Sequence, residues 1–292
     1  MSGQLKEVRE RIGSVKSTQQ ITKAMKMVSA AKLKRATDAI TQMRPYSEKL
    51  STVLGNIISA SSADELNLKL AEERDVKKVL VVVFTSDRGL CGAFNTNLNK
   101  KAKALITEQY SDADVTVMAM GKKAAQYFKK LDVTLNDKYA ELITNFNFEM
   151  IADIAEEIMS EYENGAYDKV ELVYAQFRNP AVQFFVSEPF LPITPSETEE
   201  DDSNAVDFIF EPNKEDIIKT LVPKILKTQL FKALLDTNAS QHGARMTAMD
   251  NATENAEELL RNLKISYNRA RQAAITTELT EIVSGAAALE GA

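Results

Sequence analysis

The chain has 292 residues, of which 44% are hydrophobic, 27% charged and 7% aromatic, with one Cys and one His. So few Cys and His residues exclude most disulfide frameworks and most metal sites, and a lone Cys suits a reducing compartment. The net charge of −6 is uneven, because residues 1–50 carry 11 basic against 4 acidic residues. Such a basic segment fits a solvated helix face, or an acidic protein partner, an anionic membrane surface or nucleic acid.

Residues 4–58 have the periodicity of an amphipathic helix. Apolar residues recur every three or four positions from Leu5 onward, as expected of a helix that packs along one face. Between Gln19 and Ser29 the residues at this spacing, which form the seam of the predicted helix pair, are mostly polar. The apolar residues of this stretch lie on a neighbouring face of the helix, at Ile21, Met25 and Val28. This pattern predicts an N-terminal coiled-coil helix within residues 1–63 that meets a further surface near Met25.

Residues 75–192 alternate between strand and helix patterns, which predicts a Rossmann-like α/β domain. The run at 79–84 is apolar throughout, as in a strand buried on both faces of a parallel sheet. A turn at 178–180 joins the last two strands as an antiparallel hairpin. The expected strands are 79–84, 115–120, 133–135, 169–177 and 182–190, and the expected helices are 97–110, 121–130 and 148–162.

The last hundred residues contain an acidic loop at 193–212 and then a C-terminal coiled-coil helix at 213–292, with Pro223 near its start. No apolar run reaches the length of about 18 residues that spans a membrane, and no signal segment stands out. The predicted fold class is α/β plus coiled coil. In it, long N- and C-terminal helices form an antiparallel coiled coil with the Rossmann-like domain inserted between them.

Residues 85–92, TSDRGLCG, follow the first strand, where α/β sheets bind dinucleotides. The glycine patterns of the common nucleotide-binding loops are absent, and Gly89 and Gly92 are better explained by tight turning. Cys91 has only His242 as a potential partner, and no carboxylate pair has the spacing of an acid/base site. We therefore expect no catalytic residue, cofactor or metal. A nucleotide-binding α/β enzyme with coiled-coil dimerisation arms remains the alternative.

Two groups on the long helices are candidate contact residues. Lys23, Met25 and Lys26 lie within about one turn of a helix, together with Met27. Flexible Met side chains beside Lys can adapt to acidic surfaces of different shapes. Alternatively, the Met side chains belong to the helix seam and the lysines are solvated. On the other helix, Arg245, Arg271 and Gln272 offer donors to carboxylates, as does Arg269. Beyond Glu281 the sequence SGAAALEGA is almost entirely small, which suits a narrow apolar hole or a frayed end.

Three blocks together resemble the gamma subunits of F-type ATP synthases. They are SVKSTQQITKAMKMVSAAKL at 14–33, SDRGLCGAFN at 86–95 and ITTELTEIVSGAAA at 275–288. The order of helix, α/β domain and helix is also that of the family. The resemblance covers essentially the whole chain. Its motif residues are Ser86, Asp87, Arg88, Gly89 and Gly92 in the middle block, and Ile275, Thr276, Glu278, Glu281, Gly285 and Ala286 in the last.

The resemblance implies a non-catalytic rotor shaft that couples proton flow through a membrane c-ring to ATP synthesis or hydrolysis. Its implied partners are three alpha and three beta subunits, epsilon, delta and the c-ring, on the cytoplasmic side of a bacterial plasma membrane as a peripheral protein. Met25 would face the acidic lever loop of beta, and Arg271, Gln272 and Thr276 its catch loops. The further residues implied to contact beta are Lys23, Lys26, Arg245, Glu278 and Glu281.

Overall fold

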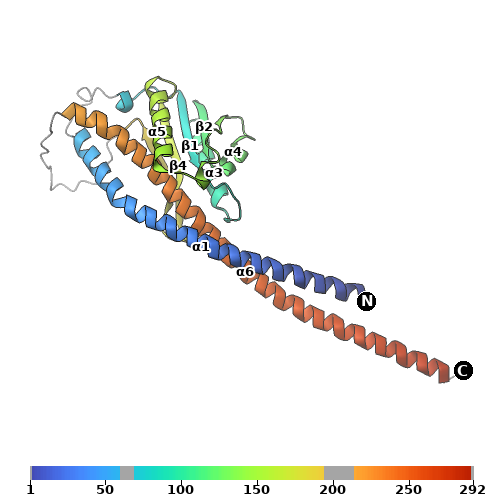
Figure 1. Ribbon diagram of the computed structural model, residues 1–292. Coiled ribbons are helices and arrows are strands. Elements are labelled where there is room, and N and C mark those ends of the chain that lie inside the picture. Colours follow the sequence, from blue (N-terminus) through green and yellow to red (C-terminus); the bar gives the residue numbers. More distant parts are fainter. Residues whose placement is uncertain (1, 60–68, 194–213, 291–292) are drawn as a thin grey trace. The chain divides into compact units, whose positions relative to one another are not determined.

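The computed structural model describes residues 2–59, 69–193 and 214–290. The chain divides into two compact units, one of residues 1–29 with 246–292 and the other of residues 30–245. Two long helices, α1 (Ser2–Ser59) and α6 (Lys214–Glu290), each contribute to both units. Figure 1 shows them at the two ends of the chain, with the α/β elements between them in sequence. The predicted long terminal helices are confirmed, and Pro45 and Pro223 both lie inside them.

The α/β elements form one five-stranded sheet in the order β3-β2-β1-β4-β5. All neighbouring strands are parallel except β4 and β5, which form the predicted antiparallel hairpin. The central strand β1 is buried from its second residue onward, which explains its unbroken apolar sequence. The strands are β1 (Lys78–Phe84), β2 (Asp114–Met120), β3 (Thr134–Asn136), β4 (Lys169–Phe177) and β5 (Gln183–Leu191).

Helices cover both faces of this sheet, so the residues of each strand divide between two apolar clusters. One cluster joins the sheet to α5 (Phe148–Glu163) and to buried residues of α6 between Val222 and Leu234. The other joins it to α3 (Phe94–Gln109) and α4 (Lys122–Phe128). The part of α6 between Val222 and Leu234 is therefore packed directly on the sheet, and the position of the strands determines the position of this part of the helix.

Several element boundaries differ from the sequence-based expectation by a few residues. Helix α3 begins at Phe94 instead of residue 97, because the Phe94 ring is buried and packs edge-on against Phe185 at a centroid distance of 5.9 Å. Helix α4 is shorter than expected, and short 3₁₀ helices occur at Lys69–Ala71 and Leu142–Thr144. Of the acidic loop predicted at 193–212, only Ile193 is among the described residues.

Candidate interaction surfaces

In the unit of residues 1–29 and 246–292, α1 and α6 pack along the predicted seam. On α1, Leu5, Val8, Ile12 and Val15 are half-buried, whereas most residues between them are exposed. On α6, the seam positions from Met249 onward are less exposed than their neighbours, and Met246 is half-buried. They are Met249, Ala256, Leu260, Leu263, Tyr267, Ala270 and Ala274. Since only one narrow stripe of each helix is covered, the remaining faces are free for other contacts.

Polar groups replace apolar ones in the middle of this seam. The hydroxyls of Thr22 and Thr253 are 2.8 Å apart, and Lys26 Nζ lies 2.5 Å from Asp250 Oδ1. Ser29 is buried one further turn along α1. Lys26, which the family resemblance implied as a contact to beta, is thus engaged within the chain.

The outer face of α1 carries exposed apolar side chains next to this polar stretch. Ile21, Met27 and Val28 are 59%, 61% and 58% exposed, and Met25 is half-buried. Lys23 is exposed on the same stretch. Large apolar side chains at this exposure are typical of a surface that is covered by a partner. The apolar residues Ile21, Met25 and Val28 therefore indicate a second contact face of the helix, separate from the seam.

The C-terminal part of α6 is the most exposed stretch of the unit. The predicted contact residues Arg271, Gln272, Thr276, Glu278 and Glu281 are all exposed. Four apolar side chains share this exposure. They are Ile275, Leu279, Ile282 and Val283, at 49%, 57%, 67% and 66%. Of these four, only Ile275 was among the residues singled out from the sequence, although Ile275, Leu279 and Ile282 have helical spacing.

The loop of residues 85–92 connects β1 to α3 and contains the family-motif residues of the middle block. Ser86 is fully buried, and its hydroxyl donates to the Arg88 carbonyl at 2.7 Å. Asn95 binds both ends of the loop, since its side-chain nitrogen lies 2.8 Å from Ser86 Oγ and 3.1 Å from Cys91 Sγ. Asp87 receives hydrogen bonds from Thr144 Oγ1 at 2.5 Å and from the Lys122 amide at 3.2 Å. Part of the loop is therefore held by hydrogen bonds among its own side chains and those of Asn95 and Thr144.

Only one of the two glycines of this loop has the left-handed backbone conformation that favours glycine. Gly92 does occupy the left-handed region, with φ of 59°, as expected for a turn glycine. The neighbouring left-handed residue is Leu90, with φ of 61°, whereas Gly89 has a negative φ. The prediction that both glycines are needed for turning is thus right for Gly92 and wrong for Gly89.

Arg245 of α6 lies against the same loop and is only 9% exposed. Its Nε donates to the Gly89 carbonyl at 3.3 Å, and its Nη2 donates to the Arg88 carbonyl at 3.1 Å. Nη2 also reaches Gln241 Oε1 at 3.4 Å. Burial lowers the pKa of Arg245, but an arginine stays charged in proteins. No carboxylate pairs with Arg245 among the ion pairs of the described residues.

His242 completes this group one turn before Arg245. Burial lowers the pKa of His242 to about 4, and the charges of Arg245 and Lys32 act in the same direction. The ring is therefore neutral at pH 7. Its Nδ1 lies 3.3 Å from Arg245 Nη1, and because arginine has only donors, Nδ1 must be the acceptor. His242 is half-buried and helps to hold the guanidinium.

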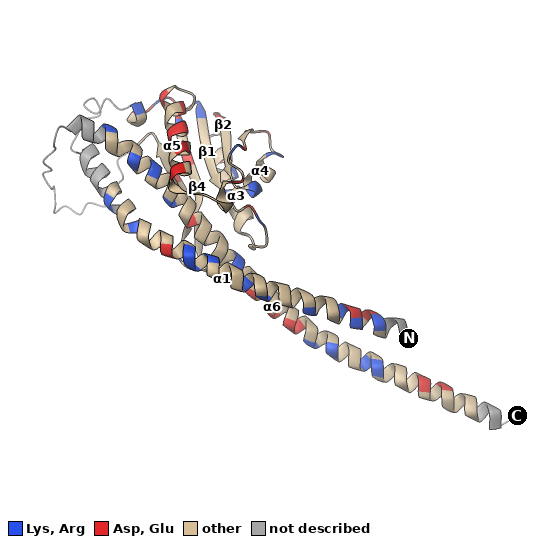
Figure 2. Ribbon diagram, in the orientation of Figure 1, with Lys and Arg blue, Asp and Glu red and all other residues tan. Residues whose placement is uncertain are grey.

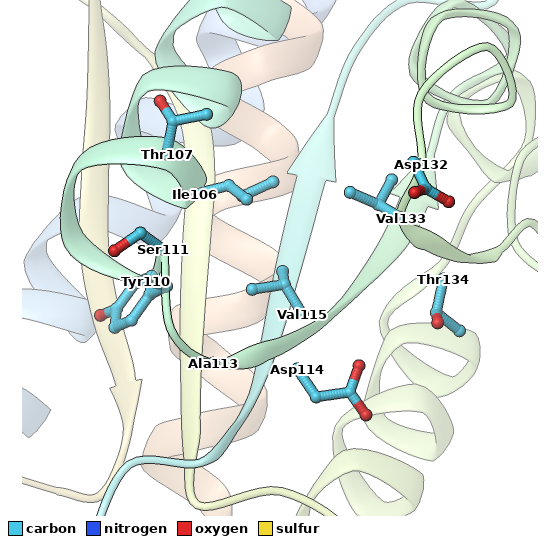
Figure 3. A pocket seen from close by; sticks show the side chains of 10 residues that line it. All are labelled: Ile106, Thr107, Tyr110, Ser111, Ala113, Asp114, Val115, Asp132, Val133 and Thr134. Atoms are coloured by element: carbon cyan, nitrogen blue, oxygen red, sulfur yellow. The ribbon is translucent and has the colours of Figure 1, made fainter.

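Hollows on the α/β domain offer little catalytic chemistry. Figure 3 shows a hollow of about 590 Å³ between the end of α3 and the first residues of β2 and β3. Its polar side chains are hydroxyls and two carboxylates, and no His, Cys, Lys or Arg is among the residues that line it. A second hollow of about 460 Å³ lies beside Arg245, with Lys32, Arg35 and Arg88 among its lining residues.

Charge is segregated on the α/β domain. Helix α5 contains six Asp and Glu and no Lys or Arg, and Figure 2 shows the red residues along it. Glu156 and Glu157 pair with Lys227 and Lys138. Over the described residues, no group of three or more His, Cys, Asp or Glu is arranged to hold a metal ion. None of the described helices combines the length and apolar character that a membrane span needs.

Comparison with known proteins gives a consistent result along the whole chain. A family model described as ATP synthase matches residues 4–289. The ATP synthase gamma chain of Cytophaga hutchinsonii is 53% identical over 291 residues, with 98% of each chain covered. That of Christiangramia forsetii is 54% identical over 288 residues, with 98% of this chain and 99% of the relative covered.

The fold is also similar to solved structures of ATP synthases. A chain in the central stalk and c-ring structure of the Tetrahymena thermophila mitochondrial ATP synthase has a TM-score of 0.56 and 25% identity. The match covers 80% of this chain and 99% of that one. A chain of the Euglena gracilis mitochondrial ATP synthase has a TM-score of 0.66 at 22% identity, over 99% of this chain and 95% of that one. The resemblance noted in the three sequence blocks is thereby confirmed, and the chain belongs to the family of ATP synthase gamma chains.

Proposed function

We propose that this chain turns as the shaft inside a ring of three alpha and three beta subunits and transmits torque between that ring and a membrane c-ring. The observation that carries the proposal is the end of α6. There, apolar and charged side chains are exposed together over residues 271–286, beyond the stretch that α1 covers. Exposed apolar surface of this kind is typical of a surface that a partner covers, and membership in the gamma-chain family supports the ring as that partner.

The geometry of the paired helices suits rotation. A helix pair is stiff along its axis, and its faces differ chemically, with exposed apolar residues near Ile21 and exposed charges near Arg271. Each of three equivalent beta subunits would therefore meet a different face. Since a partner shifts a conformational equilibrium only through contacts that differ between the states, such asymmetry can give the three subunits different nucleotide affinities.

The proposed contacts with beta are the exposed residues on two stretches. On α1 they are Lys23 and Met25, and on α6 they are Arg271, Gln272, Thr276, Glu278 and Glu281. Their side chains are exposed or half-buried, so their ion pairs would be weak, screened by salt and readily exchanged during turning. Lys26 and Arg245 belong to the same proposed region, but both already have partners in this chain.

The remaining partners in the proposal are epsilon, delta and the c-ring. The chain would thus lie on the cytoplasmic side of a bacterial plasma membrane as a peripheral component of its complex. Catalysis would belong to alpha and beta, and this chain would hold no cofactor. Proton flow through the c-ring would drive ATP synthesis, and the reverse rotation would accompany hydrolysis.

Reconstitution separates this proposal from the alternative of a nucleotide-binding enzyme. The purified chain is tested for ATP binding and hydrolysis, and then mixed with alpha and beta subunits of a close bacterial relative. We expect no tight nucleotide binding by the chain alone and a stable complex with rapid ATP hydrolysis after mixing. Tight ATP binding by the chain alone, without assembly, would support the alternative and overturn the proposal.

A further inference from the structure

We propose that Arg245 is a positioning residue that acts within its own chain, by fixing the loop of residues 85–92 on α6. The resemblance implied a contact between Arg245 and beta, as it did for Arg271. The two arginines have different surroundings, because Arg245 is 9% exposed whereas Arg271 is on the open surface of the helix. A residue with so little exposed surface offers only a small area for contact with another subunit.

The contact requires the shape of an arginine. Nε and Nη2 lie on one edge of the guanidinium and reach two consecutive carbonyls, those of Gly89 and Arg88, at 3.3 and 3.1 Å. Gln241 and His242, on the preceding turn of α6, hold the group from the other side. A lysine has one ammonium nitrogen on a flexible stem, so it cannot bridge the two carbonyls with the same geometry.

The loop depends on an external tether because its backbone is strained. Leu90 has a φ of 61°, a left-handed conformation that costs a leucine about 1 kcal/mol or more. Its side chain is 62% exposed, so packing of that side chain does not offset the cost. Hydrogen bonds to the two preceding carbonyls, from Arg245 and from Ser86, therefore act together with the contacts of Asn95 and Asp87 to hold the loop in this conformation.

The base of the tether is rigid. Just before Arg245, Ser240 Oγ donates to the Ala175 carbonyl at 3.0 Å, and Thr237 Oγ1 accepts from the Ala175 amide at 3.3 Å. At Gly243 the helix lies so close to the hairpin that an added Cβ would be 3.0 Å from Pro180 Cα. The guanidinium is thus presented from a part of α6 that is hydrogen-bonded to β4, and it ties the loop after β1 to the same helix.

A consequence follows for torque transmission, and it rests on the rotary function proposed above. With the loop tied to α6, the carboxyl end of β1 and the loop that follows it must turn with the helix. Without the tether, the loop would be displaced when torque acts on the helix. The contact itself does not depend on rotation, so it can be tested on the free chain.

Cys91 provides the test because it is the only cysteine of the chain, belongs to the loop and is only 2% exposed. The rate at which a maleimide labels Cys91 reports how often the loop opens. We compare the full-length chain with Arg245→Gln and Arg245→Lys, and use Arg271→Gln and Arg261→Gln as matched controls at exposed positions of the same helix. Labelling at several low urea concentrations distinguishes local opening, which is insensitive to urea, from global unfolding.

We expect both Arg245 variants to label at least about tenfold faster than the unaltered chain, without added urea dependence, and both controls to label at the original rate. Arg245→Lys keeps the charge and most of the packing, so it remains informative if Arg245→Gln does not fold. Unchanged labelling in Arg245→Lys and in any folded Arg245→Gln would overturn the proposal. Faster labelling that rises steeply with urea would also overturn it, because Arg245 would then support the fold as a whole.

Discussion

Lys26 of α1 and Asp250 of α6 form an ion pair with an N–O distance of 2.5 Å, next to the hydroxyl contact between Thr22 and Thr253. Moving four residues forward on α1 corresponds to moving three backward on α6, which is the order of an antiparallel pair. Polar contacts inside a helix seam favour one register over its neighbours, because a slip leaves them without partners. These two pairs therefore fix how the helices are aligned.

Exchanging the two charges tests this alignment. The single variants Lys26→Asp and Asp250→Lys each place like charges together and should lower the melting temperature of the chain. The double variant should recover most of the loss. Both side chains are about 40% exposed, so the coupling free energy should be modest, about 0.2–1 kcal/mol, and should shrink with added salt. A double variant no more stable than the sum of the single effects would show that the pair does not set the register.

The apolar side chains near the end of α6 should matter for assembly and not for folding. Ile275, Leu279 and Ile282 are exposed in the chain, so changing all three to Ser should alter its unfolding free energy by no more than about 0.5 kcal/mol for each site. Binding to the alpha–beta ring should weaken at least about tenfold, because covered apolar surface is lost. Val76→Ser, an exposed site outside this helix, is the control. Equal affinity of the triple variant and the unaltered chain would contradict the proposed contact.

Substitution by alanine should destabilise the chain at one glycine of α6 and not at another. Gly243→Ala places a methyl group 3.0 Å from Pro180 Cα and 3.2 Å from the Pro180 carbonyl oxygen, so the hairpin must shift. We expect a loss of about 1–3 kcal/mol in unfolding free energy, despite the better helix propensity of alanine. Gly285→Ala meets open space and should cost nothing. Thermal unfolding followed by circular dichroism compares them, and equal stability of the two variants would disprove the close approach at Gly243.

Asp236 predicts a pH dependence of stability. Burial raises the pKa of Asp236 to about 6 and Glu188 adds to the effect, while the Phe177 backbone, Lys232 and Arg44 oppose it. Because the folded chain holds this proton more tightly than the unfolded chain, stability falls as pH rises from about 4 through about 6. Asp236→Asn should remove that fall and stabilise the chain at pH 8. Parallel stability profiles of the variant and the unaltered chain between pH 4 and 8 would contradict the raised pKa.

The sequence was sufficient for the elements whose pattern is local. The unbroken apolar run of β1 follows from burial of both faces of the strand. The three-to-four spacing on the two long helices follows from burial of one face of each helix, and the structure confirms all three elements. The seam positions Thr22 and Ser29 were also correct, although they are polar.

Features that depend on tertiary contacts were beyond the sequence pattern. Arg245 reaches carbonyls more than 150 residues away in the chain, so its burial has no local signal. The left-handed backbone at Leu90 was also missed, since tight turning was expected of Gly89 and Gly92. Phe94 was placed outside α3 because its packing partner, Phe185 of β5, is also far away in the sequence.

Direct observation of rotation tests the central claim. A bead is attached at Glu108→Cys, an exposed position of α3, in a chain whose buried Cys91 is changed to Ala, and this chain is assembled with immobilised alpha and beta subunits. The proposed shaft function predicts that the bead turns in one direction while ATP is hydrolysed and stops when ATP is removed. A complex that hydrolyses ATP at full rate while its bead only fluctuates about one position would contradict it.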